Sequence, residues 1–264
     1  MELTAANHAF ITGGASGIGL GIADALVKRG VRVTIADINA EALAEVWATR
    51  GNAFRGVPLD VRDRDQWLAA KASAEAAFGA VDVLVNNAGI APDGLELADS
   101  VPESFERIIG INMMGVYNGI VTFGAGIRAL GHGHILNVAS MAGLSSERAT
   151  SGAYSASKYA VVSMSETLRV EMAPHGVGVS VMCPGLVMTN LPENTARIGG
   201  NLRPVGKMPG GLDLAIAGEM AVRGIERGSF YILTAFDRDE PIRRRFDEQL
   251  AAFAAGMDAD LAQS

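Results

Sequence analysis

Short apolar runs alternate with longer amphipathic stretches from about residue 8 to residue 183, and this alternation constrains the fold most. Runs rich in β-branched residues predict strands, and apolar residues recurring every three or four positions predict helices. The predicted strands are 8–12, 31–37, 54–59, 81–86, 134–140 and 178–182, and the predicted helices are 17–29, 41–49, 64–78, 104–130 and 155–172. Such βαβ units predict a doubly wound α/β fold, with a parallel sheet covered by helices on both faces.

One domain is expected for residues 1–264, because no linker or shift in composition divides the chain. Residues 186–211 carry scattered Pro and Gly without a clear period, so we expect a substrate lid there. Residues 211–228 are predicted as a helix and 229–234 as a strand. A terminal amphipathic helix is predicted at about 241–255.

Charge and cysteine content exclude several classes of protein. The net charge is −7 and no basic stripe is present, so nucleic acid is not an expected partner. The single cysteine, Cys183, allows no internal disulfide. No signal-peptide pattern opens the chain, and no uninterrupted apolar run reaches the ~18 residues of a membrane span. A soluble, cytoplasmic protein without membrane contact is therefore expected.

A glycine-rich turn follows the first predicted strand and opens the first predicted helix. Its residues are Thr12, Gly13, Gly14, Ala15, Ser16, Gly17, Ile18 and Gly19. Missing Cβ atoms let the backbone approach a diphosphate, and free N–H groups at the helix start attract its charge. The spacing is G-x-x-x-G-x-G, and its strand–turn–helix setting predicts a Rossmann-type dinucleotide site at Gly13, Ser16, Gly17, Ile18 and Gly19.

Asp37 closes the second predicted strand, 20 residues beyond Gly17. A carboxylate there can accept hydrogen bonds from the adenosine ribose and would repel a 2′-phosphate. Neither Ser16 nor the next residue, Ile38, offers a cation for that phosphate. The pattern predicts NAD over NADP at Asp37 and Ile38, although a helix cap is the alternative role for the aspartate.

Tyr154 and Lys158 lie four residues apart in a predicted helix, so both side chains lie on one face. A free tyrosine titrates near ~10 and needs help to exchange protons at neutral pH. A neighbouring ammonium favours the phenolate, so we expect Lys158 to lower the pKa of Tyr154. A surface pair on an amphipathic helix is the alternative.

With these residues assembled, the chain resembles the short-chain dehydrogenase/reductase family over about residues 7–190. The resemblance depends on five signals in order: the turn at 12–19, Asp60-Val61, Asn86-Asn87-Ala88-Gly89, Asn112 with Ser140, and Tyr154 with Lys158. The C-terminus departs from the usual family pattern, because a charged helix follows Phe230–Thr234.

The resemblance implies a role for each matching residue. The implied catalytic residues are Asn112, Ser140, Tyr154 and Lys158. The implied cofactor-binding residues, besides those of the turn and Asp37, are Asp60, Val61, Asn86, Ala88, Gly89, Tyr154, Lys158, Pro184, Gly185, Val187 and Thr189. In this family pattern the tyrosine exchanges the substrate proton, the serine steadies the substrate oxygen, the lysine binds the nicotinamide ribose, and the asparagine holds a water.

The expected function is NAD-dependent hydride transfer between a secondary alcohol, or its ketone, and the nicotinamide. A small apolar substrate, aromatic or alicyclic, is expected from the candidate substrate residues Met141, Leu144, Met188, Leu191 and Met208. That these side chains only pack the lid is the alternative. An NAD-binding redox sensor or regulator is the second functional class, and an epimerase or dehydratase is the third.

A homo-oligomer, dimer or tetramer, is expected, because the Gly- and Ala-bearing helices at 104–130 and 155–172 allow close pairing between subunits. No metal site is expected, because His132 and His134 have no acidic or Cys cluster near them in the sequence. Cys183 lacks an obvious base partner and is expected to be inert.

Overall fold

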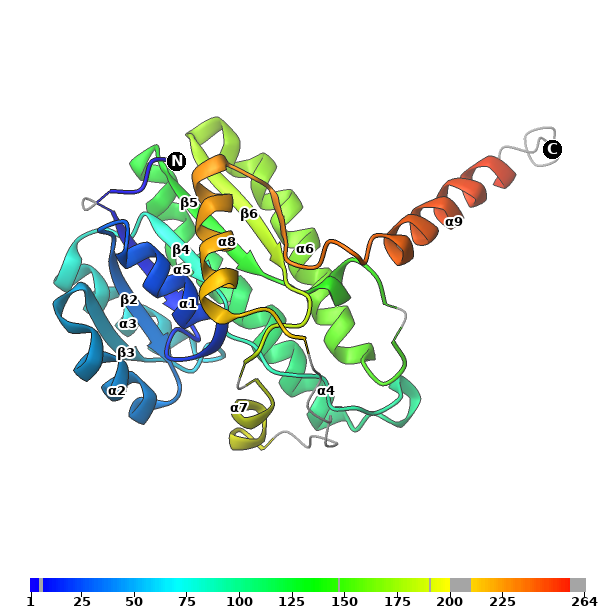
Figure 1. Cartoon of the computed structure of the whole chain (residues 1–264), viewed down its shortest axis with the longest axis horizontal. Coiled ribbons are helices and arrows are strands. Elements are labelled where there is room, and N and C mark those ends of the chain that lie inside the picture. The colour runs from blue at the N-terminus through cyan, green and yellow to red at the C-terminus, as the bar shows by residue number, and fades with distance from the viewer. Residues whose placement is uncertain (5–6, 147, 190, 200–209, 257–264) are drawn as a thin grey trace.

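The fold is the predicted doubly wound α/β architecture in a single domain (Figure 1). The computed structural model describes residues 1–4, 7–146, 148–189, 191–199 and 210–256. Within them, one sheet holds seven parallel strands in the order β3-β2-β1-β4-β5-β6-β7. The strands are β1 His8–Thr12, β2 Arg32–Asp37, β3 Phe54–Pro58, β4 Val83–Asn86, β5 Gly133–Val138, β6 Val177–Cys183 and β7 Tyr231–Leu233.

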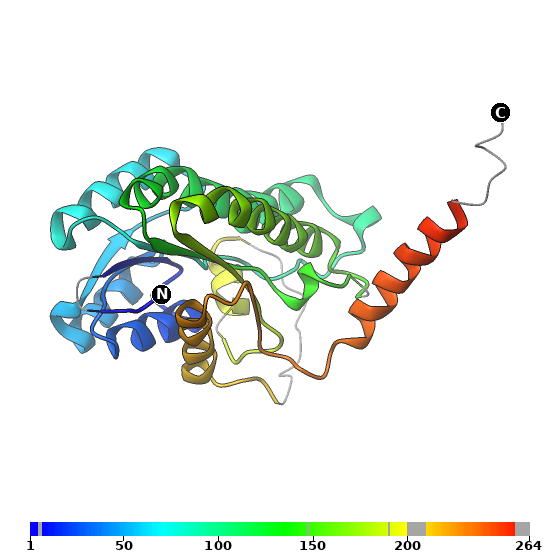
Figure 2. The same ribbon diagram turned by 90° about the horizontal axis from the view of Figure 1, so that it is seen from above.

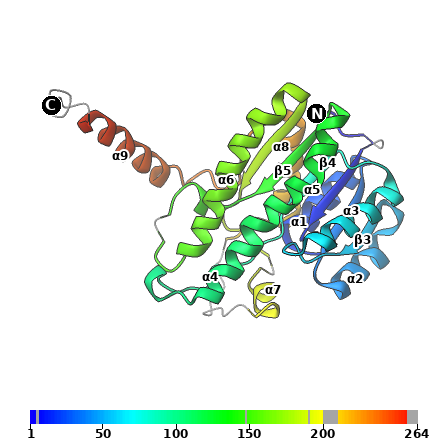
Figure 3. The same ribbon diagram turned by 180° about the vertical axis from the view of Figure 1, so that it is seen from behind.

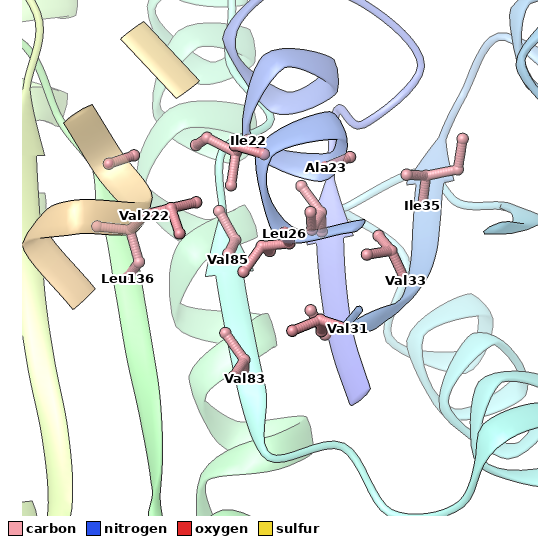
Figure 4. Packing of buried hydrophobic residues seen from close by; sticks show 14 of the residues in the cluster. Ile22, Ala23, Leu26, Val31, Val33, Ile35, Val83, Val85, Leu136 and Val222 are labelled. Carbon is pink, nitrogen blue, oxygen red and sulfur yellow. The ribbon is translucent and has the colours of Figure 1, made fainter. Parts of the chain in front are cut away.

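Helices cover both faces of this sheet (Figure 2). On one face, buried residues of α1, α2 and α8 pack in one cluster with β1, β2 and β4 (Figure 4). On the other, α3, α4, α5 and α6 share a second cluster that includes Phe10, Trp67 and Phe123. The helices are α1 Gly17–Val27, α2 Ala40–Arg50, α3 Arg64–Phe78, α4 Pro102–Ile109, α5 Gly115–Leu130, α6 Gly152–Met172, α7 Leu191–Arg197, α8 Leu214–Arg227 and α9 Glu240–Gly256.

The neighbours of β1 create the position of the site. Strand β1 pairs with β2 on one side and with β4 on the other. From β1 the strand order runs through β2 and β3 in one direction and through β4 to β7 in the other. Helix connections on opposite faces leave a crevice beyond the carboxyl ends of these strands, where α/β proteins bind ligands.

The predicted helix at 104–130 is continuous but not uniform. A π-helical turn, η3 (Gly110–Met114), separates α4 from α5. Among the described residues, Pro102–Leu130 is the one helix long and apolar enough to cross a membrane, and half of its apolar window is buried within the protein. A core helix of a soluble protein passes the same test.

The crossing of α1 and α8 requires glycine on both helices. A Cβ added at Gly218 would lie 2.2 Å from the backbone of Gly21, and a Cβ at Gly21 would lie 2.4 Å from the Leu214 carbonyl oxygen. Because backbone atoms cannot move away as a flexible side chain can, overpacking is unavoidable there.

We therefore expect Gly218→Ala to lower the free energy of unfolding by ~1–3 kcal/mol, measured by urea titration. The matched control is Gly126→Ala on α5, where an added Cβ meets nothing within 4 Å. That substitution is expected to stabilise the chain by up to ~1 kcal/mol through helix propensity. Equal effects of the two substitutions would contradict the close crossing.

Candidate functional site

A single broad cleft brings together most of the predicted site residues. It has a volume of about 1030 Å³ and lies beyond the carboxyl ends of the central strands. Predicted residues that line it are Gly13, Ser16, Gly17, Ile18, Asp37, Ile38, Asp60, Val61, Ala88, Gly89, Ser140, Tyr154, Lys158, Pro184, Gly185, Val187, Met188, Thr189 and Leu191. This volume is at the upper limit of pockets that bind drug-sized ligands. It is large enough for a dinucleotide together with a substrate.

The glycine-rich turn has the geometry expected for close backbone approach. Gly13 and Gly17 adopt φ of 61° and 55°, a region that favours glycine. An added Cβ at Gly17 would meet only Thr189, at 3.6 Å, so its surface is open toward the cleft. Gly19 does not line the cleft: its Cβ would lie 2.3 Å from the Gly13 carbonyl oxygen, so this glycine closes the turn.

Asp37 is tied to this turn. Its carboxylate accepts hydrogen bonds from the backbone N–H of Ala15, at 3.2 Å, and of Asn39, at 3.0 Å. Burial raises the pKa of Asp37, and these backbone donors oppose the shift. Asn39, rather than the aspartate, accepts from Ala42 N–H and caps α2. The helix-cap alternative for Asp37 is therefore not observed.

Asp60, which follows β3 next to Asp37 at the end of β2, is paired with an arginine. The Asp60 carboxylate accepts hydrogen bonds from Arg62 Nε, at 2.9 Å, and from Arg62 Nη2, at 2.6 Å. The guanidinium lowers the pKa of this carboxyl. The Val61 carbonyl accepts from Trp67 Nε1 and Asn118 Nδ2, both at 2.9 Å. These bonds hold the segment after β3 in place, and Arg62 joins the cleft lining as a residue that the sequence analysis missed.

The two asparagines at the end of β4, Asn86 and Asn87, have different positions relative to the cleft. Asn86 is buried and donates to Asn137 Oδ1 at 2.9 Å, so the prediction that it walls the cleft is wrong. Asn87 lines the cleft instead and donates to the carbonyl oxygens of Thr12 and Gly13. The adjacent letters Asn-Asn did not show which side chain faces the cleft, because alternate residues of a strand point to opposite sides.

Ser140, Tyr154 and Lys158 come together from two elements. Ser140 ends the segment after β5, and the other two lie on α6. Ser140 lies close enough to the Tyr154 phenol to affect its pKa, and its Oγ accepts a hydrogen bond from Ala142 N–H at 3.1 Å. The Lys158 ammonium lies 5.7 Å from the Tyr154 ring centroid and donates to the Val138 carbonyl at 3.1 Å. The pair therefore faces the cleft, and the surface alternative is excluded.

The ionisation of these groups differs from the sequence-based expectation. Burial raises the pKa of Tyr154, and the neighbouring Ser140 opposes that shift. Burial lowers the pKa of Lys158 to about 8, so this amine is mainly protonated at neutral pH. The prediction that the ammonium lowers the pKa of the phenol is wrong for the chain's own groups, because burial is the larger effect.

Asn112 occupies the π-helical turn and does not line the cleft. Its side-chain oxygen accepts from Ile90 N–H at 2.8 Å, and its amide donates to the Ile90 carbonyl at 3.1 Å and to Ser157 Oγ at 3.3 Å. An added Cβ at Gly89 would lie 3.2 Å from Asn112 Oδ1 and 3.5 Å from Lys158 Nζ. Asn112 thus fixes the backbone of Ile90, next to Gly89 and Lys158, in the cleft wall. The role of Asn112 in holding a water stays a prediction.

The lid region contains a short helix that the sequence analysis missed. Asn194 and Thr195, consecutive on α7, reach opposite walls of the cleft: Asn194 Nδ2 donates to Ser16 Oγ at 3.0 Å, and Thr195 Oγ1 accepts from Ala91 N–H at 3.0 Å. The helix has only seven residues, too few to show a hydrophobic period. Arg148 and Arg197 are further lining residues that no sequence signal identified.

The candidate substrate residues separate into three groups. Met188 and Leu191 line the cleft. Met141 and Leu144 do not: the turn after Ser140 directs them against a cluster that includes Val161 and Cys183, so their predicted substrate role is not supported. Met208 lies outside the described residues.

Histidine and cysteine take structural roles. His134 Nε2 lies 2.8 Å from Ser180 Oγ, and burial lowers the pKa of this histidine to about 3. Burial raises the pKa of the Cys183 thiol to about 12. Across the described part of the chain, no group of three or more His, Cys, Asp or Glu side chains is placed to hold a metal ion.

Comparison with known proteins shows the family of this chain. The model of the short chain dehydrogenases matches residues 7–197, and the chain belongs to this family. The C alpha-dehydrogenase of a Sphingobium species is 38% identical over 190 residues, covering 70% of this chain and 62% of the relative. The 3-alpha-(or 20-beta)-hydroxysteroid dehydrogenase of Mycobacterium bovis is 37% identical, with 70% of each chain covered.

A solved structure agrees over nearly the whole length. A short chain dehydrogenase/reductase from Burkholderia phymatum, solved in complex with NAD, is 31% identical with a TM-score of 0.87. The match covers 95% of this chain and 96% of that one. The family is one of oxidoreductases, and its nicotinamide cofactor fits the open glycine turn and the nearby carboxylate of Asp37.

Proposed function

We propose that the protein is an NAD-dependent oxidoreductase that transfers a hydride between a secondary alcohol, or its ketone, and the nicotinamide. The observation that carries the proposal is the shared cleft: Ser140, Tyr154 and Lys158 line it together with the glycine turn and Asp37. Proton-exchanging groups and a dinucleotide site are the two halves that such a reaction needs.

In this proposal the chain's own residues transfer the alcohol proton and stabilise the charge that develops on the substrate oxygen. The bound nicotinamide supplies or accepts the hydride. Tyr154 takes the alcohol proton at its phenolic oxygen, and Ser140 hydrogen-bonds the same substrate oxygen. Lys158, protonated below its pKa of about 8, orients the nicotinamide ribose. Asn112 holds the backbone wall at Ile90.

The proposal includes NAD as the preferred cofactor. A 2′-phosphate beside Asp37 would meet a carboxylate, and the adjacent Ile38 offers no compensating cation. We expect kcat/KM with NAD to exceed that with NADP by at least ~10-fold, as one well-placed charge repulsion of ~1.4 kcal/mol or more requires. Asp37→Asn is expected to narrow this ratio.

The matched control for that experiment is Asp65→Asn on the outer side of α3, which is expected to leave the cofactor ratio unchanged. Steady-state kinetics with both cofactors measures the ratio for each variant. A wild-type preference for NADP would refute the cofactor assignment while leaving the hydride-transfer assignment intact.

For the substrate we propose an apolar secondary alcohol of aromatic or alicyclic type. Ile90, Leu186, Met188 and Leu191 provide apolar lining near the candidate catalytic residues. The names of two relatives, a C alpha-dehydrogenase and a hydroxysteroid dehydrogenase, support this class. A panel of aryl, alicyclic and short linear secondary alcohols, followed by the absorbance of reduced nicotinamide, tests it; the linear alcohols are expected to be the poorest substrates.

A redox sensor or regulator that binds NAD is the second candidate. The complete set of Asn112, Ser140, Tyr154 and Lys158 favours the enzyme, because binding alone needs no proton-exchanging phenol. A cytoplasmic location is also part of the proposal, supported by the single, buried Cys183.

A further inference from the structure

Arg148 is a basic side chain of the cleft that the proposed reaction does not use. It belongs to the segment that joins β5 to α6, between Ser140 and Tyr154, and it lines the same cleft as both. The start of α6, which follows this segment, lies at the same end of the molecule as α4 and α7 (Figure 3). Arg148 therefore belongs to the half of the cleft that holds the candidate catalytic residues.

The backbone of Arg148 is fixed against α6. Its carbonyl accepts a hydrogen bond from Ser151 Oγ at 2.8 Å, and the hydroxyls of Ser151 and Ser155 lie 3.2 Å apart. Next to Ser151, Thr150 adopts a φ of 66°, a left-handed conformation that a β-branched residue rarely takes. Such a conformation persists only where the surroundings enforce it, and it is typical of ligand-binding segments. Arg148 is thus held close to the helix that carries Tyr154.

The Arg148 guanidinium has no partner in the described part of the chain. It is exposed, and it makes no hydrogen bond, ion pair or ring contact with a described residue. The acidic side chains among the described lining residues are Asp37 and Asp60, at the ends of β2 and β3. Ser140 follows β5, which β1 and β4 separate from β2. In a chain of net charge −7, the described lining at Ser140 is therefore basic and not acidic.

Two other basic side chains of the cleft already have roles. The Arg62 guanidinium is paired with the Asp60 carboxylate. Lys158 donates to the Val138 carbonyl and, in the function proposed above, orients the nicotinamide ribose. Neither is therefore available to a charged group on the substrate.

Arg197 is the remaining basic lining residue, and it lies toward the cofactor. It follows Asn194 by about one turn of α7, so the two side chains share one side of that helix. Asn194 Nδ2 donates to Ser16 Oγ in the glycine turn, where a diphosphate is expected. The charges of a dinucleotide thus fall near Arg197, and Arg148 is the guanidinium that they leave without a partner.

We propose that Arg148 binds a carboxylate that the substrate carries away from its reacting carbon, so that the substrate is an anionic secondary alcohol or ketone. The planar guanidinium fork matches the two oxygens of a carboxylate. One unpaired guanidinium balances a monoanion but not the nearly double charge of a phosphate group. This inference rests on the function proposed above and adds an anionic end to the aromatic or alicyclic body.

Apolar side chains provide a surface for that body. Leu186 and Met188 line the cleft and are 39% and 57% exposed, and Ile90 and Leu191 extend this lining. Apolar lining with a few placed polar groups is the usual composition of a small-molecule site. An uncharged substrate would partly desolvate Arg148 without giving it a partner, which costs affinity.

Binding of matched ligand pairs tests the proposal without requiring turnover. The probes are para-acetylbenzoate, meta-acetylbenzoate and a cyclohexanone carboxylate, each beside its uncharged carboxamide. Isothermal titration calorimetry measures the Kd of each for the full chain, with and without saturating NAD. At least one carboxylate is expected to bind ~10-fold more tightly than its carboxamide, as one charge-assisted contact provides. This preference is expected to fall when the ionic strength rises from ~0.05 to ~0.5 M.

Arg148→Gln is expected to bring the two members of the preferred pair to within ~3-fold of each other. The matched control is Arg227→Gln, an exposed arginine in the last turn of α8 that does not line the cleft, and it is expected to keep the wild-type preference. Because both side chains are exposed, urea titration is expected to show both variants as stable as the wild type.

Four results would overturn the proposal. They are equal binding within every pair, a preference that does not change with salt, a preference that survives in Arg148→Gln, and a preference lost in Arg197→Gln but kept in Arg148→Gln.

Turnover separates this inference from the function on which it rests. If neutral secondary alcohols are oxidised and no carboxylate is preferred, the anion site is refuted and the hydride transfer stands. If the carboxylate preference depends on Arg148 but no alcohol is oxidised by NAD, the anion site stands and the proposed function is refuted.

Discussion

Replacing Tyr154 by phenylalanine is expected to lower kcat by ~10²–10⁴-fold, the usual contribution of a positioned acid or base. The phenol is the group that exchanges the substrate proton in the proposed mechanism, and Ser140 opposes the rise of its pKa caused by burial. Removing one oxygen leaves the ring and its packing on the second core cluster in place. The loss is therefore expected in turnover and not in cofactor binding.

Two measurements on this variant separate chemistry from folding. Quenching of protein fluorescence by NAD is expected to give a Kd within ~3-fold of wild type, which is under 1 kcal/mol. The control is Tyr159→Phe, also on α6, whose ring contacts Arg245 rather than lining the cleft. If Tyr154→Phe retained near-wild-type turnover, another group would have to move the proton.

Lys158→Met is expected to reduce activity by about 10²-fold or more while making the chain more stable at pH 7. Burial lowers the pKa of this lysine from 10.5 to about 8, so the folded chain holds its proton less tightly than the unfolded chain. Removing the buried charge is expected to raise the free energy of unfolding at pH 7 by about 3 kcal/mol. Loss of the hydrogen bond to the Val138 carbonyl is expected to reduce this gain by about 1 kcal/mol.

The pH dependence gives the sign of this effect. Between about pH 8 and 10.5 the unfolded chain binds more protons at Lys158 than the folded chain, so the wild-type free energy of unfolding rises with pH from this group. The methionine variant lacks that rise, and its advantage is expected to shrink from pH 7 toward pH 10. Urea titrations of both chains at the two pH values measure it; a variant that is less stable at pH 7 by the same amount as at pH 10 would contradict the buried charge.

Local patterns were sufficient to predict the fold. β-Branched runs and helical periods placed the strands and long helices to within about three residues, because each is determined by its own burial pattern. The candidate cleft followed from the glycine turn, Asp37 and the Tyr154–Lys158 spacing, since the carboxyl ends of parallel strands meet at one edge.

Features that depend on distant contacts were not predictable in this way. The π-helical turn accompanies the double hydrogen bond between Asn112 and Ile90, which are 22 residues apart. The docking of α7 depends on Ser16 and Ala91, which are 178 and 104 residues from their partners. Packing against β6 and α6 determines that the side chains of Met141 and Leu144 point away from the cleft. No residue pattern in the short turn indicates this orientation.

The central claim is net hydride transfer from a secondary alcohol to NAD, and isotope transfer tests it most directly. Alicyclic and aryl secondary alcohols deuterated at the carbinol carbon are incubated with the protein and NAD, and the reduced cofactor is analysed by mass spectrometry. We predict ketone and reduced NAD in equal amounts, with one deuterium per reduced nicotinamide. NAD that binds but stays oxidised with every alcohol of the panel would contradict the account and favour the sensor.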